Sequence, residues 1–537
     1  MSLLEIENLS VDIGGHPILR DVSLTIAPGE ALGLVGESGS GKSMTALSVM
    51  RLLPEGARMR GAVRLDGEDL TALTEPAMCR VRGARVGMVF QEPMTALNPL
   101  KTIGDQVAEV IRIHRADPDP DAAALRALAR AGLPPEQFPP GRFPHDLSGG
   151  QRQRVVIAMA VALRPRLLIA DEPTTALDVT TQAVILDLLK RLAKEDGAGL
   201  MMITHDLAVV ADMADRIAIM KDGEVVEEGP TAPLFSAMAH PYTRALFAAS
   251  THRPARDRRP AGEPVLEVSG AVRDYALPRR SLFGPRRAFR AVDGVSLAIR
   301  AGENVGLVGE SGCGKSTLSR AILGLEGLQG GGVSLVGRPF SPAAPSERRR
   351  DIQVVFQDPY GSFDPRWRVA DLVAEPFHLV HPRPPKAERR AKVEAMLEAV
   401  GLRAEDAERH PHQFSGGQRQ RIAIARALIT EPRLVVLDEA VSALDVSVRA
   451  RILDLLAGLS DRLGVSYLFI SHDLHVVRAI TDRVLVMKAG KIVEEGETET
   501  VFAAPRHPYT RELLAATPDL EAALAAREAA SVSAESR

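Results

Sequence analysis

The feature that most constrains this chain is an internal repeat. Ser-Gly-Gly-Gln-Arg-Gln-Arg occupies residues 148–154 and returns at 415–421, an offset of 267 residues. Copies of Asp-Glu, His-Asp-Leu and His-Pro-Tyr-Thr keep the same offset. A period of ~20–50 residues would indicate a solenoid, whereas a period this long indicates whole duplicated domains. We therefore predict that the 537 residues form two copies of one domain.

Composition gives the boundaries of the two copies. The stretch 251–264 is rich in proline and charge, which predicts a linker because it has few apolar side chains to form a core. This places the first domain at 1–250 and the second at 265–515. Residues 516–537 are rich in Ala, Glu and Ser and predict a C-terminal tail, either a fraying helix or a disordered segment. The Arg-rich insertion at 279–290 has no counterpart in the first copy and is interpreted as a solvated loop, with contact to anionic lipid as the alternative.

The bulk properties exclude several classes of protein. The formal net charge of −3 does not favour a nucleic-acid partner. Two cysteines, Cys79 and Cys313, are too few for a disulfide framework or a four-ligand metal cluster and suit a reducing cytoplasm. No apolar run approaches the ~18–20 residues that cross a bilayer. The acidic, alternating start of the sequence is also unlike a signal peptide. Any action on a membrane is therefore expected from outside the lipid.

The apolar pattern of each copy predicts an α/β fold. Short apolar runs end in a glycine-rich turn, in an acidic pair or just before a histidine. They cover 31–35, 167–170 and 201–203 in the first copy and 304–308, 434–437 and 467–470 in the second. Such runs suit strands of a sheet covered on both faces, with function at the carboxyl ends of the strands. Between Gln91 and Ser148 the pattern becomes helical and proline-punctuated, which predicts a smaller helical subdomain.

A phosphate-binding loop follows the first of these strands in each copy. The pattern G-x-x-x-x-G-K-[ST] lets glycine N–H groups converge on phosphate oxygens at the positive end of a helix. Lys42 and Lys315 are predicted to reach the β/γ-phosphates of ATP, and Ser43 and Ser316 to bind Mg²⁺. The predicted nucleotide-binding residues are Gly36, Glu37, Ser38, Gly39, Ser40, Gly41, Lys42 and Ser43, and then Gly309, Glu310, Ser311, Gly312, Cys313, Gly314, Lys315 and Ser316.

An acidic pair ends a buried strand in each copy. An unpaired carboxylate would be costly there, so Asp171 and Asp438 are predicted to hold Mg²⁺ directly or through water. The adjacent Glu172 and Glu439 are candidates for the general base that polarises the attacking water. An acidic cap at a strand end is the alternative for either pair taken alone, and the P-loop in the same copy weakens that alternative.

Two more polar residues recur in each copy. His205 and His472 follow a strand, where an imidazole can bind the γ-phosphate and hold the water and the base in line. Gln91 and Gln357, in Val-Phe-Gln-Glu-Pro and Val-Phe-Gln-Asp-Pro, are predicted to contact Mg²⁺ and the water at the entrance to the helical subdomain. That position suits a sensor that links the state of the nucleotide to a partner.

The repeated Ser-Gly-Gly-Gln resembles the signature motif of the ABC ATPases, and with the other motifs the resemblance covers nearly the whole chain. It implies two tandem P-loop NTPase domains, each with a RecA-like core, an antiparallel β subdomain and a helical subdomain. It also implies that each signature closes on the ATP held by the other domain, with the D-loop residues Asp178 and Asp445 at the same interface. The signature residues are Ser148, Gly149, Gly150 and Gln151, and Ser415, Gly416, Gly417 and Gln418.

Two positions depart from the family pattern. Before the P-loop the family has an aromatic residue that stacks on adenine; the first copy offers only Ile13, whereas the second has Tyr275. We therefore predict weaker base stacking at the first site. In the second copy Ala440 follows the candidate base where the first copy has Pro173, which removes no catalytic group.

A narrower resemblance is to the oligopeptide/dipeptide/nickel importer ATPases, carried by Gly-Glu-Ser-Gly-x-Gly-Lys-Ser, Val-Phe-Gln-Asp-Pro and the His-Pro-Tyr-Thr repeats. The fused arrangement is similar to the double ATPases of microcin C/peptide importers and, less closely, of glutathione importers. The resemblance implies peptide import at the cytoplasmic face of the bacterial inner membrane. The implied partners are two integral-membrane permease subunits, docked near Gln91 and Gln357, and an extracytoplasmic substrate-binding protein. The His-Pro-Tyr-Thr turns themselves are interpreted as helix starts rather than substrate contacts.

Two alternatives come from other functional classes. A fused ABC translation factor would have a long charged helical linker and an Asn-His-Leu-Asp D-loop, whereas this chain has a proline-broken linker and Thr-Ala-Leu-Asp. A DNA-repair or chromosome-structural ATPase would insert a coiled coil or zinc module between P-loop and signature. Only 105 residues separate Lys42 from Ser148, which is too few for such an insertion. The sequence leaves open which solute is transported and whether both sites hydrolyse ATP equally.

Overall fold

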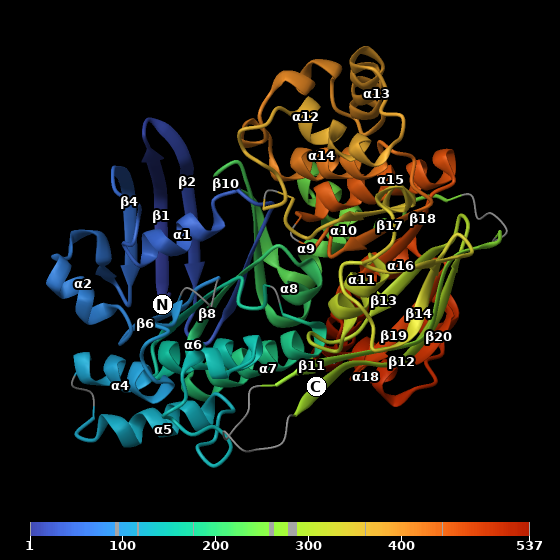
Figure 1. Cartoon of the computed structure of the whole chain (residues 1–537). Helices are drawn as coiled ribbons and strands as arrows, with labels where there is room; N and C mark the ends of the chain where they lie inside the picture. Colours follow the sequence, from blue (N-terminus) through green and yellow to red (C-terminus); the bar gives the residue numbers. More distant parts are fainter. Residues whose placement is uncertain are drawn as a thin grey trace. The chain divides into compact units, whose positions relative to one another are not determined.

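The computed structural model describes residues 2–91, 96–114, 117–175, 177–256, 262–277, 287–359, 361–442 and 444–535 (Figure 1). The chain forms two compact units. Unit 1 comprises Met1–Ser250 together with Ala516–Arg537, and unit 2 comprises Thr251–Ala515. Most of the Arg-rich insertion predicted at 279–290 lies outside the described residues. No helix among the described residues is long and apolar enough to cross a membrane.

Unit 1 contains two sheets within the described part of the chain. One is antiparallel, in the order β2-β1-β4-β5, and the other has six strands, in the order β10-β9-β3-β8-β7-β6. In the larger sheet all neighbours are parallel except β10, which pairs antiparallel with β9 at one edge. The strands are β1 (Leu4–Ile13), β2 (His16–Ile26), β3 (Ala31–Val35), β4 (Ala57–Leu65), β5 (Glu68–Asp69), β6 (Val86–Val89), β7 (Leu167–Asp171), β8 (Gly199–Thr204), β9 (Arg216–Lys221) and β10 (Glu224–Pro230).

The helices of unit 1 include a layer that corresponds to the predicted helical subdomain. In this layer α4 and α5 pack on α6, and α6 packs on α7 (Figure 1). Their buried apolar stripes recur at helical spacing, for example at Val107 and Ile111 in α4. The helices are α1 (Lys42–Val49), α2 (Glu75–Val81), α4 (Ile103–His114), α5 (Pro120–Arg130), α6 (Gly149–Val161), α7 (Val179–Asp196), α8 (Leu207–Met213), α9 (Thr231–Ala237), α10 (Pro241–Ser250) and α19 (Leu520–Glu535).

Unit 2 repeats this plan in the residues that the structure describes. Its sheets run in the orders β12-β11-β14-β15 and β16-β17-β18-β13-β19-β20. Its strands are β11 (Pro264–Ala276), β12 (Ala288–Arg300), β13 (Asn304–Val308), β14 (Gly330–Leu335), β15 (Arg338–Phe340), β16 (Ile352–Val355), β17 (Leu434–Asp438), β18 (Ser466–Ile470), β19 (Arg483–Lys488) and β20 (Lys491–Glu497). Its helices are α11 (Lys315–Ile322), α12 (Val369–Ala374), α13 (Lys386–Ala399), α14 (Gly416–Leu428), α15 (Val446–Leu463), α16 (Leu474–Ile480), α17 (Thr498–Ala503) and α18 (Pro508–Ala516). The predicted α/β class and its tandem duplication are thereby confirmed.

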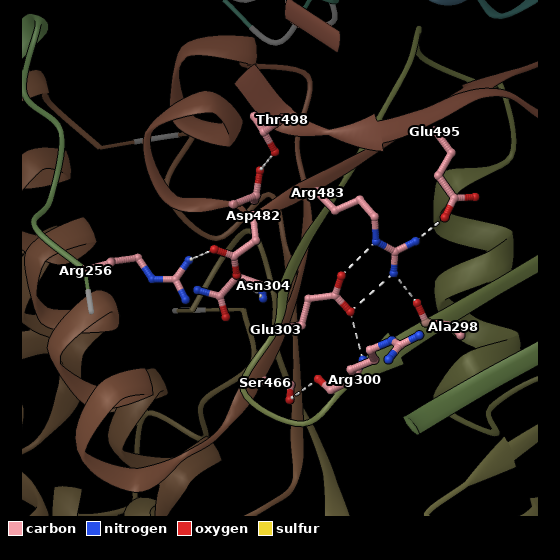
Figure 2. Close-up of polar contacts among 11 residues, drawn as sticks. Arg256, Ala298, Arg300, Glu303, Asn304, Ser466, Asp482, Arg483, Glu495 and Thr498 are labelled. Atoms are coloured by element: carbon pink, nitrogen blue, oxygen red, sulfur yellow. Dashed lines mark hydrogen bonds and ion pairs between the residues drawn. The ribbon is translucent and has the colours of Figure 1, made fainter. Parts of the chain in front are cut away.

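The segments that follow α10 and α18 do not stay with the unit they leave. Residues 251–256 belong to unit 2, where Arg256 donates to the carbonyl oxygen of Ile480 at 2.9 Å. Arg256 also donates to Asp482 at 3.0 Å (Figure 2). The C-terminal helix α19 belongs to unit 1 and packs on α8, with Arg527 donating to the carbonyl oxygens of Ala211 and Asp212. Each unit therefore holds a segment that continues from the other.

Sheet topology brings the predicted site residues of unit 1 to one edge. The P-loop follows β3, Asp171 ends β7, His205 follows β8 and Gln91 lies shortly after β6. These four strands are consecutive neighbours and all parallel, so their carboxyl ends lie at the same edge of the sheet. The neighbours β13, β18, β17 and β16 do the same in unit 2.

Candidate active sites

The P-loop of unit 1 surrounds the side chain of Lys42. Its Nζ donates to the carbonyl oxygens of Gly36 and Glu37, each at 2.8 Å, and the lysine is only 5% exposed. Gly41 has a φ of 104°, a left-handed backbone that glycine adopts readily at the start of α1. The loop thus holds a buried cation at the amino end of a helix, which is the electrostatic setting of a phosphate site.

Unit 2 builds the same loop around Lys315. The lysine Nζ donates to the carbonyl oxygens of Gly309 at 2.6 Å and Glu310 at 2.8 Å. Cys313 stands where the first loop has Ser40, and burial raises the pKa of its thiol. The thiol is therefore neutral and buried, with its sulfur 3.8 Å from Lys315 Nζ.

The two adjacent acids of unit 1 have opposite electrostatics. Asp171 is 5% exposed, and burial raises its pKa to about 6 even though Ser43 Oγ donates to its Oδ1 at 3.0 Å. Burial would also raise the pKa of Glu172, but hydrogen bonds to His205 and Thr175 outweigh it and hold the value at about 2. At neutral pH Glu172 is an ionised acceptor, whereas Asp171 carries a charge that its surroundings disfavour.

Three side chains converge on the Glu172 carboxylate. Gln91 Nε2 donates to Oε2 at 2.8 Å, Thr175 Oγ1 donates to the same oxygen at 2.9 Å, and His205 Nδ1 lies 3.3 Å from Oε1. Glu172 also has a φ of 45°, an unusual value for a non-glycine residue. A carboxylate fixed this firmly, next to the P-loop lysine, is placed to act on a group bound at the loop.

The site of unit 2 shares the core of this arrangement. Glu439 has a φ of 51°, and the hydrogen bond from His472 Nδ1, with a separation of 3.2 Å from Oε1, lowers the pKa of the carboxyl. Burial would lower the pKa of His472, but Glu439 raises it. Burial also raises the pKa of Asp438.

The surroundings of the two glutamates differ, however. Gln357 makes no hydrogen bond to Glu439 within the described residues. Ser442, the counterpart of Thr175, donates to the backbone oxygen of Glu439 rather than to its carboxylate, at 2.9 Å. The two sites are therefore not equivalent.

The signature residues lie at helix starts. Ser148 and Gln151 form a capping box at the amino end of α6, and Ser415 and Gln418 form one at α14. In unit 1 Gln151 Oε1 accepts from the N–H of Ser148 at 3.0 Å, and Ser148 Oγ accepts from the N–H of Gln151 at 3.3 Å. The second glycine of each motif meets the next helix, because a Cβ on Gly150 would lie 2.3 Å from Thr181 Cγ2.

The remaining predicted residues cap helices or lie in the antiparallel sheets. Asp178 caps α7 by accepting from the N–H of Thr181 at 3.0 Å, and Asp445 precedes α15. Tyr275 lies in β11, where its hydroxyl donates to Glu326 at 2.6 Å and Arg273 lies over its ring at 4.9 Å. Ile13 ends β1 in the equivalent sheet of unit 1.

Sequence reasoning missed three groups of residues at these sites. Thr175, which holds Glu172, carries no motif of its own. Tyr242 and Tyr509 were assigned to helix starts, yet each hydroxyl reaches a P-loop. Glu227 and Glu494 anchor the turns that carry these tyrosines. The 267-residue offset between the two glutamates was the available signal, because it marks them as part of the repeated framework.

Comparison with known proteins identifies the family. The model described as ABC transporter matches residues 19–175 and 292–442. The chain belongs to the ABC transporter family. The model of the oligopeptide/dipeptide transporter C-terminal region also matches, at residues 226–270 and 493–536. The protein is therefore an ABC transport ATPase of the oligopeptide type, with two P-loop units and two such C-terminal regions.

Two relatives match this chain along nearly its whole length. The glutathione import ATP-binding protein GsiA of Escherichia coli O157:H7 is 47% identical, and its namesake from strain K12 is 46% identical. Each match covers 97% of this ABC ATPase and 90% of the relative. Among solved structures, cbiO1 from Clostridium perfringens, part of an ABC transporter complex, shares 29% identity over 45% of this chain and 92% of that chain, with a TM-score of 0.40.

Proposed function

We propose that this ABC ATPase energises the import of glutathione or similarly small peptides across the bacterial inner membrane. The observation that carries the proposal is the match to glutathione import ATP-binding proteins along 97% of the chain, including both oligopeptide-type C-terminal regions. In this proposal the chain acts at the cytoplasmic face of the membrane as a peripheral subunit. Its partners are two permease subunits, docked near Gln91 and Gln357, and an extracytoplasmic substrate-binding protein.

Each unit is proposed to bind ATP at its P-loop. Lys42 and Lys315 would turn from the loop carbonyls to the β/γ-phosphates, a change that exchanges a neutral acceptor for a charged one. Glu172 and Glu439 would accept a proton from the attacking water at a carboxylate oxygen. His205 and His472 hold those carboxylates in place, and Gln91 adds a third contact in unit 1.

Mg²⁺ fits the residues next to each lysine. The Ser43 hydroxyl and the buried Asp171 carboxylate lie 3.0 Å apart, and burial raises the pKa of Asp171 to about 6. A divalent cation is the partner that favours the charged form of such a carboxylate. Ser43, Asp171 and Gln91 would hold it in unit 1, and Ser316, Asp438 and Gln357 in unit 2. When bound, Mg²⁺ neutralises charge on the phosphates.

We further propose that the two ATP sites are composite. Ser415, Gly416 and Gly417 would close on ATP held by Lys42, and Ser148, Gly149 and Gly150 on ATP held by Lys315. This assignment is supported by the exposure of both Ser-Gly starts, which leaves a serine hydroxyl and helix N–H groups available to a second phosphate group. Asp178 and Asp445 would lie at the same interfaces.

Three experiments test the proposal. Purification from native membranes in mild detergent should recover two integral-membrane permease subunits with the chain, and vesicles containing the complex and its binding protein should accumulate glutathione. Recovery of ribosomal proteins without a permease would contradict the importer function. The double variant Glu172→Gln/Glu439→Gln should lose ATPase activity by at least ~100-fold while still binding ATP. A wild-type rate in this variant would contradict the assignment of the bases.

A further inference from the structure

Each His-Pro-Tyr-Thr turn starts a helix by the same contacts. The N–H of Tyr242 donates to His240 Nδ1 at 3.2 Å, and Pro241 is the first residue of α10. In unit 2 the N–H of Tyr509 donates to His507 Nδ1, also at 3.2 Å, at the start of α18. Histidine thus caps the helix and proline begins it, which accounts for two of the four residues of the motif.

A glutamate ties each turn to the large sheet. In unit 1 the Glu227 carboxylate of β10 accepts from the N–H groups of Ala239 at 2.8 Å and His240 at 3.1 Å, and from Thr243 Oγ1. Glu494 of β20 accepts from the N–H groups of Arg506 and His507 in unit 2. Burial would raise the pKa of Glu227, but these donors outweigh it and lower the pKa, so the anchor is ionised at neutral pH.

The tyrosine of each turn reaches a P-loop. The N–H of Glu37 donates to Tyr242 Oη at 3.2 Å, across 205 residues of sequence. The N–H of Glu310 donates to Tyr509 Oη at 3.0 Å, across 199 residues. The same contact occurs in both copies, so it is a repeated feature of the fold.

The contacted residue is also one of the two whose carbonyl oxygens hold the P-loop lysine. In unit 1 the N–H of Glu37 donates to Tyr242 while its C=O accepts from Lys42 Nζ at 2.8 Å. In unit 2 Glu310 is held in the same way, by Tyr509 on one side and by Lys315 at 2.8 Å on the other. When the lysine turns to a phosphate, the C=O loses that donor, and the tyrosine hydroxyl keeps its hold on the N–H.

The aim of each hydroxyl is fixed by packing around its ring. Lys221 Nζ lies over the Tyr242 ring at 5.2 Å from the centroid, and Lys488 Nζ lies over the Tyr509 ring at 4.2 Å. Tyr509 is only 1% exposed. A ring held by a cation–π contact and by the helix start has few orientations available, so its hydroxyl stays directed at the loop.

We propose that Tyr242 and Tyr509 are positioning residues of the two nucleotide sites, which keep the P-loop in its phosphate-binding shape while the lysine moves to the nucleotide. The inference rests on the proposed function, because it takes ATP as the ligand of the loop. It also gives the C-terminal regions of the oligopeptide type a role at the nucleotide.

The test uses the purified full-length chain with Mg·ADP as the binding probe. A neutral hydrogen bond contributes enough to change a dissociation constant by ~3–10-fold. Tyr242→Phe/Tyr509→Phe should therefore raise the Kd for Mg·ADP and the KM for ATP ~3–10-fold, with kcat within about twofold, since the contact organises the loop before the chemical step. In calorimetric titration each single variant should weaken one binding step and spare the other.

Tyr467→Phe is the matched control. The Tyr467 hydroxyl is buried and has no hydrogen-bond partner among the described residues, so its removal changes no P-loop contact. Kd and KM should stay at wild-type values in this variant. Tyr242→Leu/Tyr509→Leu also removes the rings, and should lower the unfolding temperature as well as weakening nucleotide binding.

Three outcomes would overturn the inference. Kd and KM that are unchanged in the double Phe variant would show that the hydroxyls do not organise the loops. If the Phe variant has the wild-type unfolding temperature and KM while the Leu variant has neither, the tyrosines act only through the packing of their rings. A wild-type chain that binds no Mg·ADP would overturn the proposed function together with the inference, whereas the first two outcomes leave the proposed function intact.

Discussion

At the residue scale, two neighbouring carboxylates are given different electrostatic surroundings. Asp171 receives one hydroxyl donor in a buried position, and its pKa rises to about 6 because burial dominates. Glu172 receives hydrogen bonds from His205 and Thr175, which with the nearby charges of His205 and Lys42 bring its pKa to about 2 despite burial. Asp171 therefore needs a nearby positive charge to be ionised readily, whereas Glu172 is ionised without one.

Removing the charge of Asp171 should stabilise the nucleotide-free protein. Its pKa is about 6 in the folded chain against an ordinary value of 3.8, so the protonated form adds stability below about pH 4 and this contribution is lost as the pH rises through about 6. At pH 7.5 Asp171→Asn should therefore unfold at a higher temperature, by the equivalent of roughly 1–3 kcal/mol, while Mg²⁺-dependent ATPase activity at this site is lost.

Scanning calorimetry at two pH values checks this prediction. At pH 5 wild-type Asp171 is largely protonated, so the difference between Asp171→Asn and wild type should shrink. A difference of the same size at pH 5 and pH 7.5 would contradict the electrostatic cause.

Thr175 and Ser442 should have unequal effects on catalysis. Thr175 donates to the Glu172 carboxylate, whereas Ser442 donates to the backbone oxygen of Glu439. Thr175→Ala should lower kcat ~3–10-fold with little change in KM for ATP, because one oxygen of the base loses a donor worth about 1 kcal/mol. Ser442→Ala should change kcat less than about twofold. Steady-state ATPase assays of both variants test this, and the reverse ranking would contradict the difference between the sites.

The sequence predicts which site residues of unit 1 lie together when each of them stands at the end of a strand. Asp171 and His205 each follow a buried apolar run, so their convergence follows from parallel strands that end at one edge. Thr175 was not predictable, because its contact depends on the turn after Glu172. The Tyr242 contact was not predictable either, since it joins residues 205 positions apart that no sequence pattern links.

At the element scale, the second signature glycine joins two helices. A Cβ on Gly417 would lie 2.4 Å from Val448 Cγ1, so the start of α14 approaches α15 more closely than any side chain would allow. Gly416 beside it has open space at the same position. One glycine is therefore required by packing, whereas the other has room for a side chain.

Alanine at these two positions should have unequal effects on stability. Gly417→Ala should lower the free energy of unfolding of unit 2 by roughly 1–3 kcal/mol, because the β-branched Val448 cannot easily move away. Gly416→Ala should change stability by less than about 0.5 kcal/mol, since its Cβ meets no atom. Thermal unfolding of both variants measures the difference. Equal destabilisation would contradict the packing role of Gly417.

The apolar pattern was sufficient to predict the central strands. The runs at 31–35 and 304–308 coincide with β3 and β13, and the helical pattern between Gln91 and Ser148 contains α4 and α5. The packing of α19 on α8 could not be predicted from the sequence. The composition of the tail is compatible with a fraying helix or a disordered segment, and it does not indicate which surface a helix would cover.

At the scale of the whole molecule, the compact units do not coincide with the sequence repeats. Unit 2 holds residues 251–256, which follow α10, and unit 1 holds α19, which follows α18. In both cases an arginine binds carbonyl oxygens near the C-terminal end of a helix, Arg256 at α16 and Arg527 at α8. A guanidinium is favoured there by the negative end of the helix dipole. Both helices begin two residues after the site histidine.

These reciprocal segments should hold a cut chain together. With a protease site inserted between residues 257 and 261, the nucleotide-free fragments should co-elute in size-exclusion chromatography after cleavage, because each keeps a segment bound in the other's unit. Arg256→Ala/Arg527→Ala should let them separate, since each charge-assisted contact is worth about 1.5–3 kcal/mol. Arg451→Ala is the matched control, because Arg451 donates to Ser447 within its own helix. Fragments that separate in the wild type, or that stay together equally well in the double variant, would contradict the role of the two arginines.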